Sequence, residues 1–190
     1  AIAGLDALEI DSQGLRIGAL ARLASIADSH EVQKHWPALA VAASAAATPQ
    51  IRNMATIGGN LLQRPRCWYF RSRDFHCLKK GGQECFAQGG QNQFHAIFDN
   101  AVCAIVHPSA VAVPLLAYGA ELDIAGQQGR RRVPLDAFFV HPTSDITREH
   151  SLGSEELLVG IHLPMPAAGT RSAYFKQGEK ESFDWPIAEV

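Results

Sequence analysis

The sequence predicts an α+β fold on three observations. Segments with helical spacing are mixed with segments that alternate as strands. The strands are mostly joined by hairpin connections, which favours α+β over a doubly wound parallel sheet. Apolar residues make up 47% of the 190 residues, enough for one sizeable domain with a hydrophobic core.

The N-terminal third predicts a strand followed by two helices. Residues 15–20 alternate well enough for a short strand. Four apolar residues at helical spacing then predict a helix over 21–28. Pro37 suits the first turn of a helix, and residues 38–47 are rich in strong helix formers. This helix should end at the proline that follows Thr48, because the residue before a proline avoids the helical region.

The C-terminal half predicts one helix and four strands. The helix should cover 111–118, and the strands should cover 120–124, 131–135, 157–163 and 172–177. A Gly-Gln-Gln-Gly turn at 126–129 should join the first two strands into a hairpin, and Pro164 should end the third. Residues 130–132 are three arginines, expected on a solvated face of the hairpin.

Charge and composition exclude several classes of protein. The net charge is -2, which argues against nucleic acid as the main partner. No apolar run approaches the roughly 20 residues that cross a bilayer, and no signal peptide is visible. No Ser-His-Asp arrangement or pair of carboxylates indicates hydrolysis, so we expect no catalytic residue on this chain. The chain starts without Met and stops at Val190, so we expect a longer native protein.

All four cysteines lie in one window of 37 residues, at Cys67, Cys77, Cys85 and Cys103. Disulfides are possible, although the chain does not resemble a small secreted disulfide scaffold. Structural zinc usually uses close Cys-x-x-Cys pairs, and none is present. Four thiolates can also hold an iron–sulfur cluster. On residue chemistry alone, cluster, zinc and disulfides or free thiols all stay open.

The surroundings of the cysteines favour the cluster. Six basic residues and one aspartate lie between 64 and 80. They could form a basic rim whose positive charge stabilises an anionic cluster, or equally a solvated face. Glycines at 81, 82, 89 and 90 allow backbone N–H groups to approach sulfur closely. Trp68, Tyr69 and Phe70 could shield a cluster from water. The nearby His76, His95 and His107 are weaker candidates as ligands, because four cysteines already suffice.

A second chemical signal is Thr56-Ile57-Gly58-Gly59-Asn60. Two adjacent glycines expose backbone N–H groups, and the flanking threonine and asparagine add side-chain donors. Such a nest suits a phosphate or a flavin ring. The plainer interpretation, a tight glycine turn between two apolar stretches, is equally compatible with these residues.

The nine residues Arg52-Asn-Met-Ala-Thr-Ile-Gly-Gly-Asn60 closely resemble the FAD-binding signature of the xanthine dehydrogenase and aldehyde oxidoreductase flavoproteins, the molybdenum hydroxylase family. Cys67-Trp-Tyr-Phe-Arg71 and the later cysteines, ahead of His107-Pro-Ser109, resemble the branch with an extra [4Fe-4S] loop, which includes periplasmic aldehyde oxidoreductases. The resemblance implies an FAD-binding domain of the PCMH (vanillyl-alcohol oxidase-like) type. Its central mixed or antiparallel sheet would be flanked by helices. The domain would cover 1–181, with an iron–sulfur insertion at 64–103, and 182–190 would begin a truncated C-terminal domain.

The resemblance also implies the site residues. Those implied for FAD are Ala46, Ala47, Thr56, Ile57, Gly58, Gly59, Asn60, Ser109, Leu158 and Lys176. Those implied for the [4Fe-4S] cluster are Cys67, Cys77, Cys85 and Cys103. Family members often have Asp where this chain has Ala110, so Ser109 could supply the polar contact instead. The family's glycine-rich pyrophosphate loop precedes this chain, so another segment should complete the FAD site.

By resemblance, the chain is the electron-transfer FAD and iron–sulfur subunit of a molybdopterin-dependent oxidoreductase of aldehyde or xanthine/N-heterocycle type. Its partners would be a molybdopterin-binding large subunit and a [2Fe-2S] small subunit, in the bacterial periplasm or cytoplasm. FAD would pass electrons from the partner's clusters to an external acceptor. Two alternatives from other classes are a zinc-stabilised, non-redox interaction module and a stand-alone flavin oxidoreductase.

Overall fold

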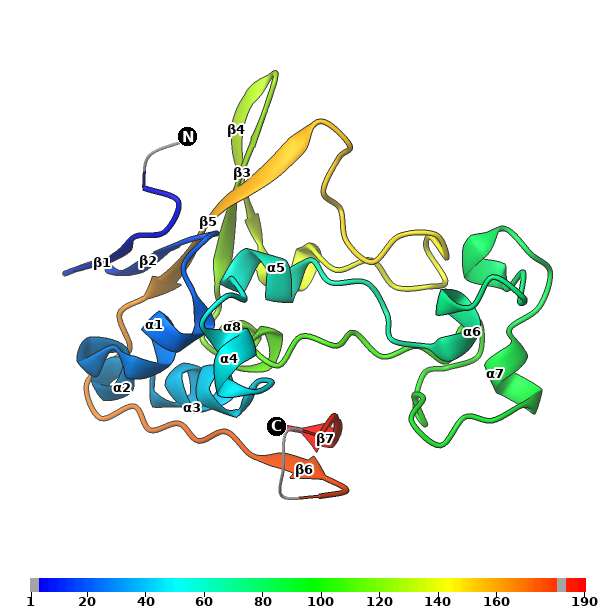
Figure 1. Cartoon of the computed structure of the whole chain (residues 1–190). Helices are drawn as coiled ribbons and strands as arrows, with labels where there is room; N and C mark the ends of the chain where they lie inside the picture. Colours follow the sequence, from blue (N-terminus) through cyan, green and yellow to red (C-terminus); the bar gives the residue numbers. More distant parts are fainter. Residues whose placement is uncertain (1–3, 181–183) are drawn as a thin grey trace. The chain divides into compact units, whose positions relative to one another are not determined.

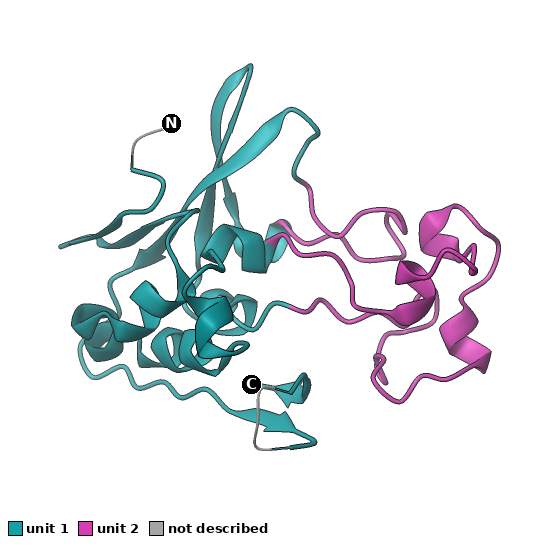
Figure 2. Cartoon of the chain, in the orientation of Figure 1, with its two compact units in different colours: residues 1–61, 109–137, 152–190 teal, residues 62–108, 138–151 magenta. Residues whose placement is uncertain are grey.

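The computed structural model describes residues 4–180 and 184–190 and divides into two compact units (Figures 1 and 2). Unit 1 consists of Ala1–Leu61, Ser109–Ala137 and Leu152–Val190. Unit 2 consists of Leu62–Pro108 and Phe138–Ser151. Unit 2 therefore contains the predicted insertion at 64–103 together with a second segment that the sequence did not assign to it.

Unit 1 is built on a five-stranded sheet in the order β1-β2-β5-β3-β4, in which every neighbouring pair is antiparallel. Its strands are β1 Leu8–Asp11, β2 Gly14–Gly18, β3 Glu121–Gly126, β4 Gly129–Pro134 and β5 Glu156–Pro164. The α+β prediction is confirmed, and the strands at 120–124, 131–135 and 157–163 correspond to β3, β4 and β5. Strand β5 is central and almost continuously buried, as expected for a strand paired on both edges.

Six helices of unit 1 accompany the sheet in the described part of the chain. They are α1 Leu23–Asp28, α2 His30–His35, α3 Pro37–Ala45, α4 Pro49–Arg52, α5 Ile57–Leu61 and α8 Ala112–Ala117. Trp36 precedes α3, is fully buried, and donates its indole N–H to the Pro164 carbonyl at 3.2 Å. This contact ties the helical layer to the end of β5. The predicted helices at 21–28, 38–47 and 111–118 are confirmed as α1, α3 and α8.

The C-terminal segment differs in part from the prediction. The strand expected over 172–177 is limited to β6 Lys176–Gly178, which pairs with β7 Pro186–Glu189. The expected domain boundary at 181/182 falls on residues 181–183, outside the described residues. Strands β1 and β7 and helices α2 and α4 were also not predicted from the sequence.

The expected glycine turn at residues 56–60 is wrong, because the chain forms helix α5 there. The Thr56 hydroxyl accepts the Gly59 N–H at 3.1 Å, as an N-cap threonine does. Ile57 and Leu61, one helical turn apart, are both fully buried. Capping and burial of one helix face outweigh the unfavourable helix propensity of the two glycines.

Unit 2 has little regular structure. Its helical segments are α6 Trp68–Arg71, the 3-10 turn η1 Leu78–Lys80 and α7 Phe86–Gly89. A small core of Tyr69, Ala87 and Ala104 packs with Phe75 and Phe86. The Tyr69 and Phe75 rings meet edge-on at 4.9 Å. An aromatic core therefore organises the cysteine segment.

Candidate functional site

The FAD signature is positioned by hydrogen bonds that use its backbone N–H groups. The N–H of Ile57 donates to the Ala21 carbonyl at 2.9 Å, and that of Gly58 donates to the Ala19 carbonyl at 2.9 Å. The Gly59 N–H donates to the Thr56 hydroxyl. A ligand here would thus meet side chains and peptide surface rather than the row of free N–H groups that a glycine nest offers.

The two signature glycines have different surroundings. Gly58 is buried, and a Cβ on it would lie 2.7 Å from the Ala19 carbonyl oxygen. Gly59 is exposed, and a Cβ on it would meet only the Thr56 hydroxyl, at 3.0 Å. Gly58 therefore permits close packing, whereas Gly59 leaves an open backbone surface that a cofactor could approach.

Asn60 is held by residues far away in sequence. Its Oδ1 accepts hydrogen bonds from the Ser109 hydroxyl at 2.7 Å and from the Val111 N–H at 3.4 Å. Ser109 is only 3% exposed, so its hydroxyl is committed to this contact. The structure thus joins two predicted site residues and gives Ser109 the role of orienting Asn60.

The other predicted flavin residues lie at the end of α3 and on β5. Lys176 donates its Nζ to the Ala45 carbonyl at 3.3 Å, which brings it next to Ala46. Arg52 donates to the carbonyls of Ala46 and Ala47 at 3.1 and 2.7 Å. Ala47 has a positive φ of 47°, an uncommon backbone conformation for alanine. Leu158 is buried on β5, the strand against which α5 packs.

Within unit 2, all four cysteines line one apolar cavity. They share it with Tyr69, Phe70, Leu78, Lys79, Phe86, Ala87, His95, Ala104 and Ile105. Cys77 and Cys103 are buried, Cys67 and Cys85 are half-buried, and each is a free thiol. The tertiary fold therefore gathers cysteines that are widely spaced in sequence, and it leaves them unpaired by disulfides.

Burial controls the protonation of these thiols. It raises the pKa of Cys103 to about 11 and also raises the pKa of Cys67. Neighbouring thiols add to both shifts: Cys77 and Cys85 act on Cys67, and Cys85 and Cys67 act on Cys103. The cavity therefore favours neutral thiols until a cation supplies the charge that stabilises thiolates.

His95 lines the same cavity and is unusual in its hydrogen bonding. Both of its ring nitrogens are buried, and neither has a hydrogen-bond partner in the described part of the chain. Its ring lies edge-on to Trp68, at 4.9 Å between centroids. Burial lowers the pKa of His95, and the nearby Asn92 carbonyl, which is too poorly placed to form a hydrogen bond with the ring, raises it by less. The balance favours the neutral ring with one N–H donor. A buried donor without an acceptor is costly, so this position fits a group that brings an acceptor into the cavity.

Two further findings concern metals and membranes. Within residues 4–180 and 184–190, no three Cys, His, Asp or Glu side chains are grouped as they would be to hold a metal ion. Among the described helices, none has both the length and the apolar character required to span a bilayer.

Comparison with known proteins places the chain in a family. A family model described as the FAD binding domain in molybdopterin dehydrogenase matches residues 1–166. The chain belongs to this family. Its sheet and helices are those of a molybdopterin dehydrogenase FAD-binding domain. The predicted fold and the predicted membership of an FAD-binding family are therefore confirmed.

Individual relatives agree with this assignment. The aldehyde oxidoreductase FAD-binding subunit PaoB of Escherichia coli K12 is 36% identical over 98% of this chain and 60% of its own length. A xanthine dehydrogenase FAD-binding subunit of Escherichia coli O157:H7 is 29% identical over 90% of this chain and 43% of its own length. The chain thus spans about two fifths to three fifths of the length of these relatives.

Solved structures show the same fold. Carbon monoxide dehydrogenase from Hydrogenophaga pseudoflava matches with a TM-score of 0.63 and 28% identity, over 96% of this chain and 47% of that chain. Carbon monoxide dehydrogenase from Oligotropha carboxidovorans matches with a TM-score of 0.67 and 20% identity, over 99% of this chain and 49% of that chain.

Proposed function

We propose that this FAD-binding domain carries two redox groups, FAD on unit 1 and a [4Fe-4S] cluster on unit 2, and transfers electrons within a molybdenum-dependent oxidoreductase. One observation supports the assignment of a [4Fe-4S] cluster to unit 2. Four free cysteines and an unpartnered buried histidine line a single apolar cavity, in a chain of an FAD-binding family.

The FAD site would be formed by the residues predicted from the signature. Thr56, Ile57, Gly58, Gly59 and Asn60 would meet the cofactor, together with Ala46, Ala47, Ser109, Leu158 and Lys176. Bound FAD would accept and release electrons, and the domain would supply position and polarity. The open surface of Gly59 and the fixed orientation of Asn60 support this assignment.

The cluster would be ligated by Cys67, Cys77, Cys85 and Cys103, which line one cavity but would have to close further around iron than the described side chains do. Cysteine thiolates are the usual ligands of [4Fe-4S] clusters, which exchange one electron at a time. The apolar lining would keep water away, and the four thiols would lose their protons as the ligands bind iron. His95 would find in a cluster sulfur the acceptor that its ring N–H lacks.

The partners and the compartment are extensions of the same proposal. Relatives named as FAD-binding subunits of aldehyde oxidoreductase and xanthine dehydrogenase support an aldehyde or N-heterocycle as the substrate of the assembly. We expect a molybdopterin-binding large subunit, a [2Fe-2S] small subunit and a location in the bacterial periplasm or cytoplasm. The chain would pass electrons from these partners to an external acceptor.

The test is a cofactor inventory of the chain purified without oxygen. Iron, acid-labile sulfide, zinc and flavin would be quantified together, with visible spectra before and after dithionite. We expect about four irons and four sulfides per chain, with bleaching on reduction. Cys103→Ser should lose the cluster, whereas Ser44→Ala, on the exposed surface of α3, should retain it. One zinc without sulfide would overturn the redox role of unit 2, and an iron–sulfur chain that binds no flavin in its complex would overturn the FAD assignment.

A further inference from the structure

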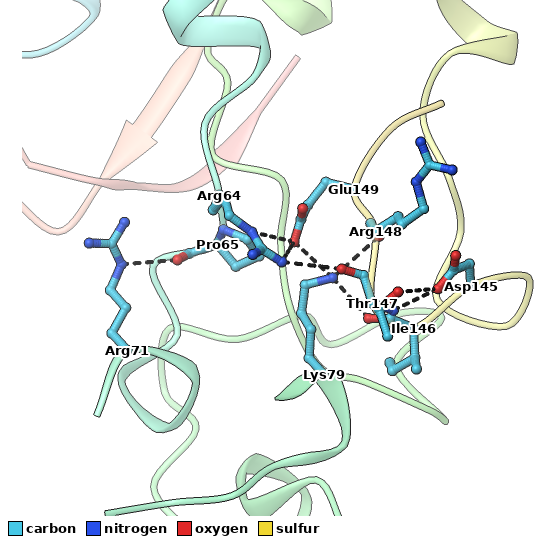
Figure 3. Close-up of polar contacts among 9 residues, drawn as sticks. All are labelled: Arg64, Pro65, Arg71, Lys79, Asp145, Ile146, Thr147, Arg148 and Glu149. Atoms are coloured by element: carbon cyan, nitrogen blue, oxygen red, sulfur yellow. Dashed lines mark hydrogen bonds and ion pairs between the residues drawn. The ribbon is translucent and has the colours of Figure 1, made fainter. Parts of the chain in front are cut away.

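Lys79 is a buried cation beside the cysteines. It lies on η1, and its side chain is only 1% exposed. Its Nζ lies 2.8 Å from Oε1 of Glu149 and donates to the carbonyls of Ile146 and Arg148 at 3.0 and 3.3 Å. These contacts join the cysteine segment to residues 138–151 within unit 2, as Figure 3 shows.

Glu149 is held as a carboxylate by two cations. Burial raises its pKa, but hydrogen bonds from Lys79 and Arg64 outweigh this effect and leave the pKa lowered. Arg64 approaches the same Oε1 at 3.1 Å and also donates to the Thr147 carbonyl at 3.2 Å. The Glu149 side chain is 8% exposed and that of Arg64 is 53% exposed. One buried anion therefore lies between a buried cation and a surface cation.

The buried pair is oriented relative to the cysteines. Lys79 lines the cysteine cavity, whereas Glu149 lines a neighbouring cavity of about 340 Å³. Lys79 thus shares a cavity with all four thiols, whereas Glu149 shares its cavity with Cys103 alone among them.

We propose that the Lys79–Glu149 pair is a redox-tuning device, in which the oriented charge of Lys79 stabilises the more negative, reduced state of the group held by the four cysteines. Neither Lys79 nor Glu149 would ligate the cluster, and both would act on it through the position of their charges. The proposal rests on the iron–sulfur part of the proposed function. A charge in an apolar environment acts more strongly than one in water, because the surrounding dielectric screens it less.

A bracing role alone explains the pair poorly. Burying two ions carries a desolvation penalty that their attraction often only balances, and an apolar pair could brace the same loops at least as well. The ion pair adds a fixed electric field in the cysteine cavity. Redox potentials of iron–sulfur clusters depend on nearby charge and hydrogen bonding, so such a field has a measurable effect.

The experiment measures the midpoint potential of the full chain by spectroelectrochemistry, for wild type, Lys79→Met, Glu149→Gln and Arg73→Met. Arg73 is an exposed residue of the same segment and serves as the control. We expect Lys79→Met to lower the potential, because the cation is lost. We expect Glu149→Gln to raise it, because Lys79 is no longer compensated. Arg73→Met should change it less than either.

The direction of each shift separates tuning from bracing. Opposite shifts in the two variants, with iron content preserved, support the proposal. If Lys79→Met fails to retain iron, Glu149→Gln alone decides, and a potential no higher than that of Arg73→Met overturns tuning. Shifts of the same sign overturn it as well. A wild-type chain without iron instead overturns the proposed function itself, and this inference with it.

Discussion

Ser109 donates a hydrogen bond of 2.7 Å from its hydroxyl to Oδ1 of Asn60, across 49 positions of sequence. The contact connects the His-Pro-Ser segment to the end of the FAD signature. Because the Val111 N–H approaches the same oxygen, the amide of Asn60 is fixed with Oδ1 turned inward. The polar role expected for Ser109 is therefore indirect, through Asn60.

Ser109→Ala should weaken flavin binding without unfolding the domain. The substitution removes one hydrogen bond, worth about 0.5–1.5 kcal/mol, and lets the Asn60 amide rotate. We expect the Kd for FAD of the complete complex to rise roughly 3- to 10-fold, since about 1.4 kcal/mol corresponds to a factor of ten. Flavin fluorescence titration would measure this, with Ser44→Ala as control. An unchanged Kd would exclude the orienting role of Ser109.

Alanine at the two signature glycines should have separable effects. Gly58→Ala should destabilise the fold by about 1–3 kcal/mol, because its Cβ would overlap the Ala19 carbonyl. Gly59→Ala should leave the melting temperature nearly unchanged but weaken FAD binding. Thermal unfolding and flavin titration of both variants would test this. Equal loss of stability in the two variants would contradict the different roles of these glycines.

His95→Phe should change the stability of the cluster-free and cluster-bound chains differently. Phenylalanine preserves the ring next to Trp68 and removes two buried nitrogens that lack partners among the described residues. We expect the cluster-free variant to gain about 1 kcal/mol. Binding of the cluster should stabilise the variant less than it stabilises wild type. Thermal unfolding with and without iron would show this, with His30→Phe as an exposed control. Equal stabilisation by the cluster in both proteins would argue against a His95 hydrogen bond.

Asp123 should make the sheet sensitive to acid. It lies 2.9 Å from Nε of Arg132 on β4 and 2.5 Å from Nε2 of His162 on β5. Burial raises its pKa, but the hydrogen bonds from these two partners outweigh burial and leave the pKa lowered. A lowered pKa in the folded state means that stability is full above the unfolded value, about 3.9, and is lost as pH falls through the folded value.

Asp123→Asn therefore should cost stability at neutral pH and little at low pH. We expect a loss of about 1–2 kcal/mol at pH 7, since Arg132 is half-exposed and the pair is partly screened. The difference in free energy of unfolding between variant and wild type should shrink below about pH 4. Urea unfolding at pH 7 and pH 3 would measure both values. A difference that stays constant with pH would exclude the ion pair as its cause.

Local sequence patterns predicted most of unit 1. Alternation predicted β3, β4 and β5, and helix formers after Pro37 predicted α3, because a half-buried strand and a buried helix face leave periodic signals. The signature predicted the FAD-binding family. The pattern failed at α5, where two glycines suggested a turn. Capping by Thr56 and burial of Ile57 and Leu61 depend on neighbours that no local window contains.

The three arginines at 130–132 illustrate the same limit on the hairpin. They are exposed, as predicted, yet Arg131 forms a 2.7 Å ion pair with Glu156 on β5, and Arg132 pairs with Asp123. The run of charged residues in the sequence indicated that this part of the hairpin is exposed to solvent. The strand order β5-β3-β4 decided which acidic residues lie beside these arginines.

By itself, the sequence determined the α+β class, the FAD signature and the confinement of four cysteines to one segment, because these are properties of residue type and spacing. Only the tertiary structure decided that the cysteines line one cavity, that His95 joins them, and that Lys79 is buried against Glu149 instead of lying on a basic rim. The reason is physical. Burial and pairing of charge depend on contacts between distant segments, and residues 138–151 carry no sequence signal of their place beside the cysteines.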